Sequence, residues 1–72
     1  MTKKYGGILK QERENRGITQ ARLAQEIGVT QQAVSNYEHD VNEPTIGVIE
    51  RIANYYDITL DELVHHEPKK NW

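Results

Sequence analysis

The sequence contains no cysteine and no run of more than two consecutive hydrophobic residues. Without cysteine, the chain can form neither a disulfide framework nor a thiolate metal site. Without a long apolar run, it has neither a membrane-spanning segment nor the hydrophobic centre of a signal peptide. At 72 residues with 36% hydrophobic content, the chain can form one small domain at most. We therefore expect a single soluble, cytoplasmic domain.

The net charge is also small, −2, but the charged residues are unevenly distributed along the chain. Residues 1–37 carry six basic and three acidic side chains, whereas residues 38–72 carry three basic and eight acidic ones. The low net charge at first argues against a nucleic-acid partner, because a basic surface is its usual electrostatic sign. Two interpretations stay open: chance in a short chain, or a polarised surface whose halves contact different partners.

Threonine marks the predicted start of four helices. Four of the five threonines stand directly before a segment with helical periodicity: Thr19, Thr30, Thr45 and Thr59. A threonine hydroxyl at that position accepts a hydrogen bond from a backbone N–H of the first turn. Glu62 follows Thr59 by three residues, which predicts a capping box.

Glycine marks the predicted helix ends. Gly17 and Gly28 stand where a helix should stop, because glycine adopts left-handed backbone geometry without steric cost. Asp40 and Asp57 are expected to take the same role.

These signals predict an all-α fold of five helices, at roughly 6–16, 20–27, 31–38, 46–56 and 60–65. No segment alternates long enough to suggest a strand. We assign the folded domain to residues 1–64 and a flexible C-terminal tail to residues 65–72. The fourth helix carries an apolar stripe that is expected to face the core: Ile46, Ile49, Ile52, Ala53 and Tyr56.

Residues 20–39 have the spacing of a helix-turn-helix. Ala24 falls where the two helices would cross closely, and Gly28 permits a tight turn between them. Val34 and Tyr37 are expected to face inward. In a DNA-binding helix-turn-helix, the second helix enters the major groove.

Several stretches of this chain match one known family. They are Arg13, Thr19-Gln20-x-x-Leu23-Ala24, Gly28-Val29-Thr30-Gln31-Gln32, Val34-Ser35-x-Tyr37-Glu38, Pro44-Thr45, and Ile52-Ala53 through Leu60-Asp61-Glu62-Leu63. Over residues 8–63, about three-quarters of its length, the chain resembles the XRE, or Cro/CI-like, family of lambdoid phage repressors and small bacterial regulators. The resemblance implies a compact, lambda-repressor-like bundle of five helices that binds operator DNA as a homodimer.

The resemblance also implies which residues read DNA bases. Gln31 and Gln32 match the first positions of the family's recognition helix, and Asn36 matches another base-reading position about one turn later. Glutamine suits this role because its amide can pair with both N6 and N7 of adenine. Ser35 could reach a base or a phosphate. Because this helix carries no cation, it depends on amide geometry and on the positive end of its dipole.

A second set of residues is expected near DNA phosphates. Gln20 resembles the family's phosphate clamp at the start of the second helix, where exposed N–H groups also favour an anion. The other candidates are Thr19, Thr30, Arg13, His39 and Asn42. Arg13 and Glu38 also match a family ion pair between the first helix and the end of the recognition helix.

The loop after the recognition helix departs from the family pattern. It reads His39-Asp40-Val41-Asn42-Glu43-Pro44, with two acids and no lysine or arginine, where many members have glycine and basic residues. Asp40 takes the usual glycine position and must tolerate left-handed geometry. Fewer cations imply a small counterion-release contribution and therefore weak non-specific binding.

The C-terminal region is the expected dimer interface. Its candidates are Leu60, Leu63, Val64, Tyr55 and Trp72, since a short chain cannot bury all of these side chains. The alternative is that the two leucines complete the monomer core.

Two functions stay open for this fold. The first is a sequence-specific regulator, most simply a repressor associated with the nucleoid. The second is an antitoxin-like or antirepressor-like module whose acidic C-terminal half binds another protein. We expect no enzyme, cofactor or metal, because adjacent His65 and His66 point apart on a helix and no nucleophile has a base nearby.

Overall fold

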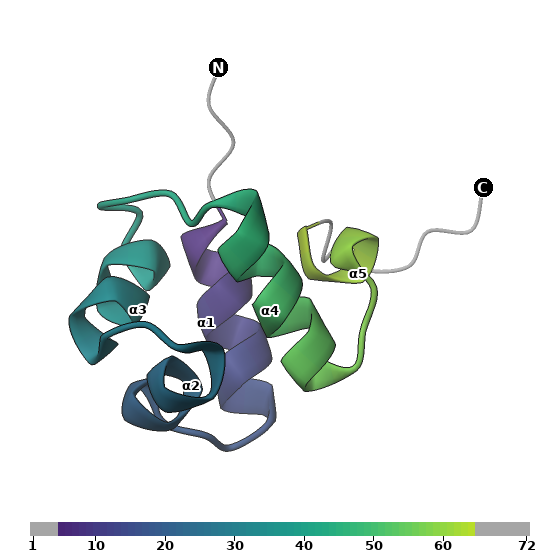
Figure 1. The fold of residues 1–72 in the computed structure, drawn as a ribbon, viewed down its shortest axis with the longest axis horizontal. Coiled ribbons are helices and arrows are strands. Elements are labelled where there is room, and N and C mark those ends of the chain that lie inside the picture. Colours follow the sequence, from purple (N-terminus) through teal and green to yellow (C-terminus); the bar gives the residue numbers. More distant parts are fainter. Residues whose placement is uncertain (1–4, 65–72) are drawn as a thin grey trace.

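The computed structural model describes residues 5–64, and this part of the chain forms five α-helices without a strand (Figure 1). They are α1 (Gly6–Asn15), α2 (Gln20–Ile27), α3 (Gln31–Glu38), α4 (Ile46–Tyr56) and α5 (Leu60–Val64). The predicted all-α class is confirmed, and each predicted boundary agrees to within one residue. The predicted tail, residues 65–72, lies outside the described residues.

Threonine caps begin the helices as predicted. The hydroxyls of Thr19, Thr30 and Thr45 each accept a hydrogen bond from a backbone N–H three residues later, at 3.0, 3.0 and 3.2 Å. Thr59 and Glu62 form the complete capping box, in which each side chain accepts from the other residue's backbone N–H, at 3.0 and 2.8 Å. These local interactions set the helix starts independently of tertiary packing.

Left-handed residues terminate the helices, also as predicted. Gly28 ends α2 at φ 75° and Asp57 ends α4 at φ 58°. Gly17 and Asp40 adopt positive φ in the loops after α1 and α3. An aspartate accepts this geometry because its short polar side chain can hydrogen-bond nearby.

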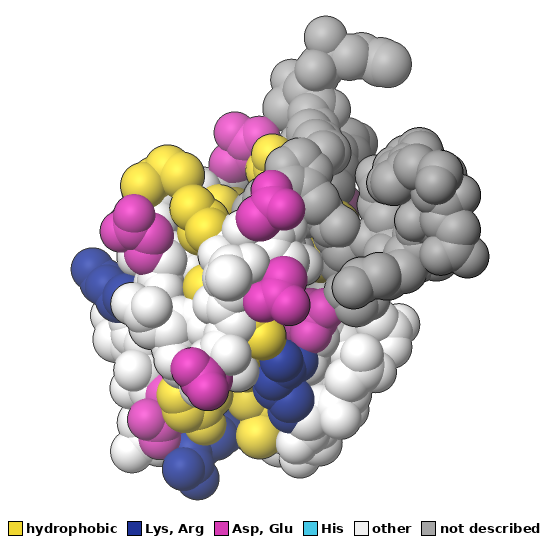
Figure 2. Space-filling model, turned by 90° about the vertical axis from the view of Figure 1, so that its right-hand side faces the viewer, with side chains coloured by type: hydrophobic (Ala, Val, Ile, Leu, Met, Phe, Trp, Pro, Cys, Tyr) yellow, Lys and Arg dark blue, Asp and Glu magenta, His cyan; other side chains and the backbone are white. Residues whose placement is uncertain are grey.

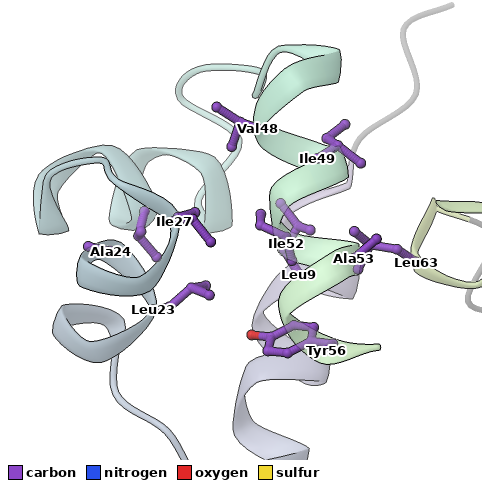
Figure 3. Close-up of a cluster of buried hydrophobic side chains, with 11 residues drawn as sticks. Leu9, Leu23, Ala24, Ile27, Val48, Ile49, Ile52, Ala53, Tyr56 and Leu63 are labelled. Carbon is purple, nitrogen blue, oxygen red and sulfur yellow. The ribbon is translucent and has the colours of Figure 1, made fainter. Parts of the chain in front are cut away.

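The helices enclose one hydrophobic core (Figure 3). Helix α2 packs on α3 and α4, α3 packs on α1, and α5 packs on α1 and α4. The α2–α3 pair and α5 therefore lie on opposite sides of the α1–α4 pair (Figure 1). The core consists of Leu9, Leu23, Ala24, Ile27, Val34, Val48, Ile49, Ile52, Ala53, Tyr56 and Leu63.

One residue of the predicted stripe on α4 does not enter the core. Ile46 is 64% exposed, whereas Val48, which the prediction omitted, is 7% exposed. At about 100° per residue, Ile46 lies about 90° from the centre of the buried stripe, in the first turn of the helix. The expected inward position of Ile46 is therefore wrong.

Candidate nucleic-acid interface

Helices α2 and α3 form a helix-turn-helix whose geometry follows from local sequence. Gly28 turns the chain in left-handed geometry, and its N–H bonds to the carbonyl of Ala24 at 2.9 Å. The caps at Thr19 and Thr30 start the two helices. The inner faces meet through Leu23, Ala24, Ile27 and Val34, each no more than 4% exposed. The outer face of α3 is thereby directed away from the core.

That outer face of α3 is polar and uncharged. Gln31 and Gln32 are exposed, and Ser35 and Asn36 are half-buried. The side-chain Nε2 of Gln32 donates to Oδ1 of Asn36 at 3.0 Å, one helical turn away. The predicted base-reading residues therefore lie on one helix and follow one another along its exposed side.

A buried ion pair joins α1 to the end of α3. Arg13 Nε lies 2.6 Å from Glu38 Oε2, and a second guanidinium nitrogen lies 3.1 Å from Oε1. The Arg13 side chain is 10% exposed and that of Glu38 is 1% exposed. The hydrogen bond to Glu38 raises the pKa of Arg13, so the guanidinium stays charged. Arg13 also donates to the carbonyl of Ile18 at 2.7 Å, which ties the α1–α2 loop into the same cluster.

Gln20 belongs to this cluster as well. Its Nε2 donates to Oε1 of Glu38 at 3.0 Å, so the carboxylate of Glu38 connects α1, α2 and α3. One N–H and the carbonyl oxygen of the Gln20 amide are left over from this bond. Arg13, by contrast, commits its guanidinium to Glu38 and Ile18 inside the protein. These bonds give Arg13 a structural role, and its predicted phosphate contact stays a prediction.

The acidic loop after α3 has a structural role that sequence reasoning missed. Oδ1 of Asp40 accepts a hydrogen bond from the backbone N–H of Gly6 at 3.0 Å and so caps the start of α1. The N-cap residue of α1, Tyr5, makes no side-chain cap of its own. A Cβ on Gly6 would lie 2.5 Å from the carbonyl oxygen of Glu38, so only glycine permits this approach of α1 to α3. No local signal could have identified a contact across 34 residues.

His39 and Asn42 flank this cap and are both exposed. Nδ1 of His39 lies 2.8 Å from the carbonyl oxygen of Ser35. Because a carbonyl can only accept, a hydrogen bond here requires the proton on Nδ1. The backbone N–H of Asn42 bonds to the carbonyl of Asn36 at 3.3 Å.

Arginines hold two further positions around the helix-turn-helix. Arg51 of α4 donates to the carbonyl of Ile27 at 3.0 Å and so satisfies the end of α2. Arg16 lies over the ring of Tyr56, 4.1 Å from its centroid. The Tyr56 hydroxyl is buried without a hydrogen-bond partner, and burial raises the pKa of this phenol from 10.0 to about 12.

The structure describes the side chains of three of the five expected dimer residues, and one of these three is buried. Leu63 has an exposed fraction of 0% and completes the core, so it offers no area to a second copy. The structure thus corrects its assignment to an interface: α5 packs on α1 and α4 through this side chain. Leu60 and Tyr55 are half-buried against the core. The side chain of Val64 and all of Trp72 lie outside the described part of the structure.

The side of the molecule that carries α5 has a mixed character. Figure 2 shows hydrophobic and acidic side chains interspersed on this face. A groove there is lined by Glu50, Ala53, Asn54, Ile58, Thr59 and Leu60. Within residues 5–64, no helix is long and apolar enough to cross a membrane, and no three histidines or acids gather as metal ligands.

This arrangement, five short helices with a capped α2–turn–α3 unit and a polar outer helix, defines the class of helix-turn-helix domains. A helix-turn-helix family model matches residues 9–63, and the chain belongs to this family. The predicted resemblance is confirmed. The membership also supports a regulator rather than an enzyme.

Individual relatives agree with this assignment. The chain is 31% identical over 68 residues to the HTH-type transcriptional regulator ImmR of Bacillus subtilis, covering 92% of this chain and 54% of ImmR. It therefore spans about half the length of that relative.

Two solved structures are similar to this fold. One is SinR, the master regulator for biofilm formation, in complex with DNA, with 27% identity, a TM-score of 0.75, and coverage of 82% of this chain and 95% of that chain. The other is the P22 c2 repressor in complex with a synthetic operator, with 24% identity, a TM-score of 0.79, and coverage of 92% and 100%. The second likeness concerns the fold alone.

Proposed function

We propose that this chain is a DNA-binding transcriptional regulator that places α3 in the major groove of double-stranded DNA. The observation that carries the proposal is the outer face of α3, which presents amides and a hydroxyl but no charge. Gln31, Gln32, Ser35 and Asn36 are the proposed base contacts, because amides match the donors and acceptors of base edges. SinR and the P22 c2 repressor, which share this fold, have structures in complex with DNA.

The proposed phosphate contacts surround this helix. Gln20 retains one N–H, and the hydroxyls of Thr19 and Thr30 retain their protons after accepting their cap bonds. His39 and Asn42 are exposed at the other end of α3. Since none of these residues is a lysine or arginine, we expect a salt slope shallower than about −3 in a plot of log K against log salt.

We further propose that the protein is a cytoplasmic, nucleoid-associated repressor that binds a pseudo-palindromic operator as a homodimer. The partly exposed side chains of Leu60, at the start of α5, and of Tyr55, near the end of α4, support this interface, to which Val64 and Trp72 would add. Measuring mass in solution at micromolar concentration tests this proposal. Leu60→Asp should shift a dimer to monomer, whereas a monomer with and without DNA would exclude it.

The DNA proposal is tested by selecting binding sites from random DNA and titrating them by fluorescence anisotropy. The selected site should bind at least about tenfold more tightly than bulk DNA, a threshold well below the roughly 10³–10⁷-fold preference typical of specific binders. Gln31→Ala should cost about 1–3 kcal/mol at one base pair and relax the preference there. Gln11→Ala, on the exposed side of α1, is the matched control and should change nothing.

Absence of any sequence preference at low salt would exclude the regulator. It would favour the second hypothesis, a protein partner for the acidic half of the chain. An equal loss on every sequence after Gln31→Ala would instead move this residue to the phosphate contacts.

A further inference from the structure

Two amides on the outer face of α3 are joined to each other. Nε2 of Gln32 donates to Oδ1 of Asn36 at 3.0 Å, although both residues stand where bases would be read. The two positions are four residues apart and therefore neighbours on the helix surface. Asn36 is half-buried, and its backbone carbonyl oxygen accepts from the backbone N–H groups of Val41 and Asn42 at 2.8 and 3.3 Å. These backbone bonds hold Asn36 in place, and its side-chain oxygen Oδ1 is the acceptor for Gln32.

This bond changes which hydrogen bonds Gln32 can still make. A glutamine amide has one carbonyl oxygen and two N–H groups. With one N–H bound to Asn36, the carbonyl oxygen and a single N–H are left for DNA. One acceptor beside one donor is the complement of adenine, whose major-groove edge has the N6 donor and the N7 acceptor.

Guanine presents a different edge in the major groove. Its N7 and O6 are both acceptors, so a side chain must present two donors to pair with both. A free glutamine could turn both N–H groups toward guanine, but Gln32 has only one left. Its carbonyl oxygen would instead face another acceptor, which is repulsive.

We propose that Asn36 is a positioning residue that makes Gln32 select adenine over guanine at one operator position. This inference rests on the proposed insertion of α3 into the major groove. It changes that proposal at one residue: Asn36, named above as a base contact, acts instead through its hydrogen bond with Gln32.

The test measures base preference on the selected operator, varied at the position whose preference Gln32→Ala relaxes. Wild-type protein should bind adenine there at least about tenfold more tightly than guanine. Asn36→Ala frees the second N–H and should reduce this ratio to less than about threefold. Asn36→Asp keeps the acceptor and should keep the ratio, while its added charge weakens binding to both operators equally. Circular dichroism checks that each variant retains its helices.

The double variant separates positioning from direct reading. In the Gln32→Ala background, Asn36→Ala should have no further effect on preference at any position. A persistent effect would show that Asn36 reads a base itself and would overturn the inference. Retention of the adenine preference in Asn36→Ala alone, or a wild-type preference for guanine, would also overturn it. If the wild-type protein prefers no sequence at all, the proposed function fails and this inference fails with it. If it prefers one sequence but the Asn36 variants behave otherwise than expected, only this inference fails.

Discussion

Replacement of Glu38 by glutamine tests the buried cluster that holds the recognition helix. The substitution preserves size but removes the charge and replaces one oxygen by an NH₂ group. In the place of Oε1, that group would be a donor facing two other donors, a guanidinium nitrogen of Arg13 at 3.1 Å and Nε2 of Gln20 at 3.0 Å. Breaking a buried ion pair from one side costs about 3–5 kcal/mol, because the other charge stays buried without its partner.

We expect a somewhat smaller loss for Glu38→Gln, about 2–4 kcal/mol, because one carbonyl oxygen can still accept from Arg13. The whole domain should be stable by only about 4–10 kcal/mol, so this loss is a large share. At about 4–8 °C per kcal/mol for a domain of this size, the melting temperature should fall by at least about 10 °C.

Glu26→Gln provides the matched control. Glu26 pairs with Arg22 at 2.9 Å on the surface of α2, where the two side chains are 34% and 58% exposed. Such an exposed pair contributes less than about 1 kcal/mol. Urea denaturation followed by circular dichroism gives the free energy of unfolding of each variant. Equal losses in Glu38→Gln and Glu26→Gln would refute the argument that burial makes the first pair important.

Three further predictions concern the core and the start of α1. Between about pH 9 and pH 12, the wild type should lose about 1–3 kcal/mol more stability than Tyr56→Phe. The reason is that the Tyr56 pKa is raised from 10.0 to about 12 on folding, so its contribution is complete below pH 10 and lost as pH rises through the folded value. Urea titrations at several pH values measure this, and equal losses in both proteins would contradict it. Asp40→Ala should lose about 1–2 kcal/mol through the missing cap, whereas Asp40→Asn, which keeps an acceptor and tolerates positive φ, should lose less than about half of that. Equal melting temperatures of the wild type and Asp40→Ala would refute the capping role of Asp40. Gly6→Ala should strongly destabilise the domain, because its Cβ would lie 2.5 Å from a backbone oxygen, whereas Gly7→Ala, with open space, should stabilise it by about 0.5–1 kcal/mol. Thermal melts that rank the two alanine variants in the opposite order would exclude the close approach.

The helix boundaries and the helix-turn-helix could be predicted because their signals are local. A threonine hydroxyl accepts from an N–H three residues away, and Gly28 turns the chain through its own φ angle. These interactions depend on neighbours in the chain, so they can be recognised in the order of residues. The pairing of Arg13 with Glu38, 25 residues apart, was available only through the family resemblance.

Other features depended on packing and could not be predicted. Ile46 fits a helical stripe by spacing, but only the placement of α4 against its neighbours leaves it exposed. Leu63 was open to either the core or an interface, and the way α5 packs on α1 and α4 buries it completely.

The chain by itself determined five helices, their caps and a polar recognition helix, because each depends on interactions within one turn or on residue spacing. The tertiary structure decided what Asp40 does. As a sequence feature, it was an acid in place of a glycine, in a loop expected near phosphates. In the folded domain its carboxylate caps Gly6, and the absent Cβ of that glycine lets α1 approach the end of α3. Contacts across 34 residues arise from the packing of whole helices, and no local pattern of residues encodes them.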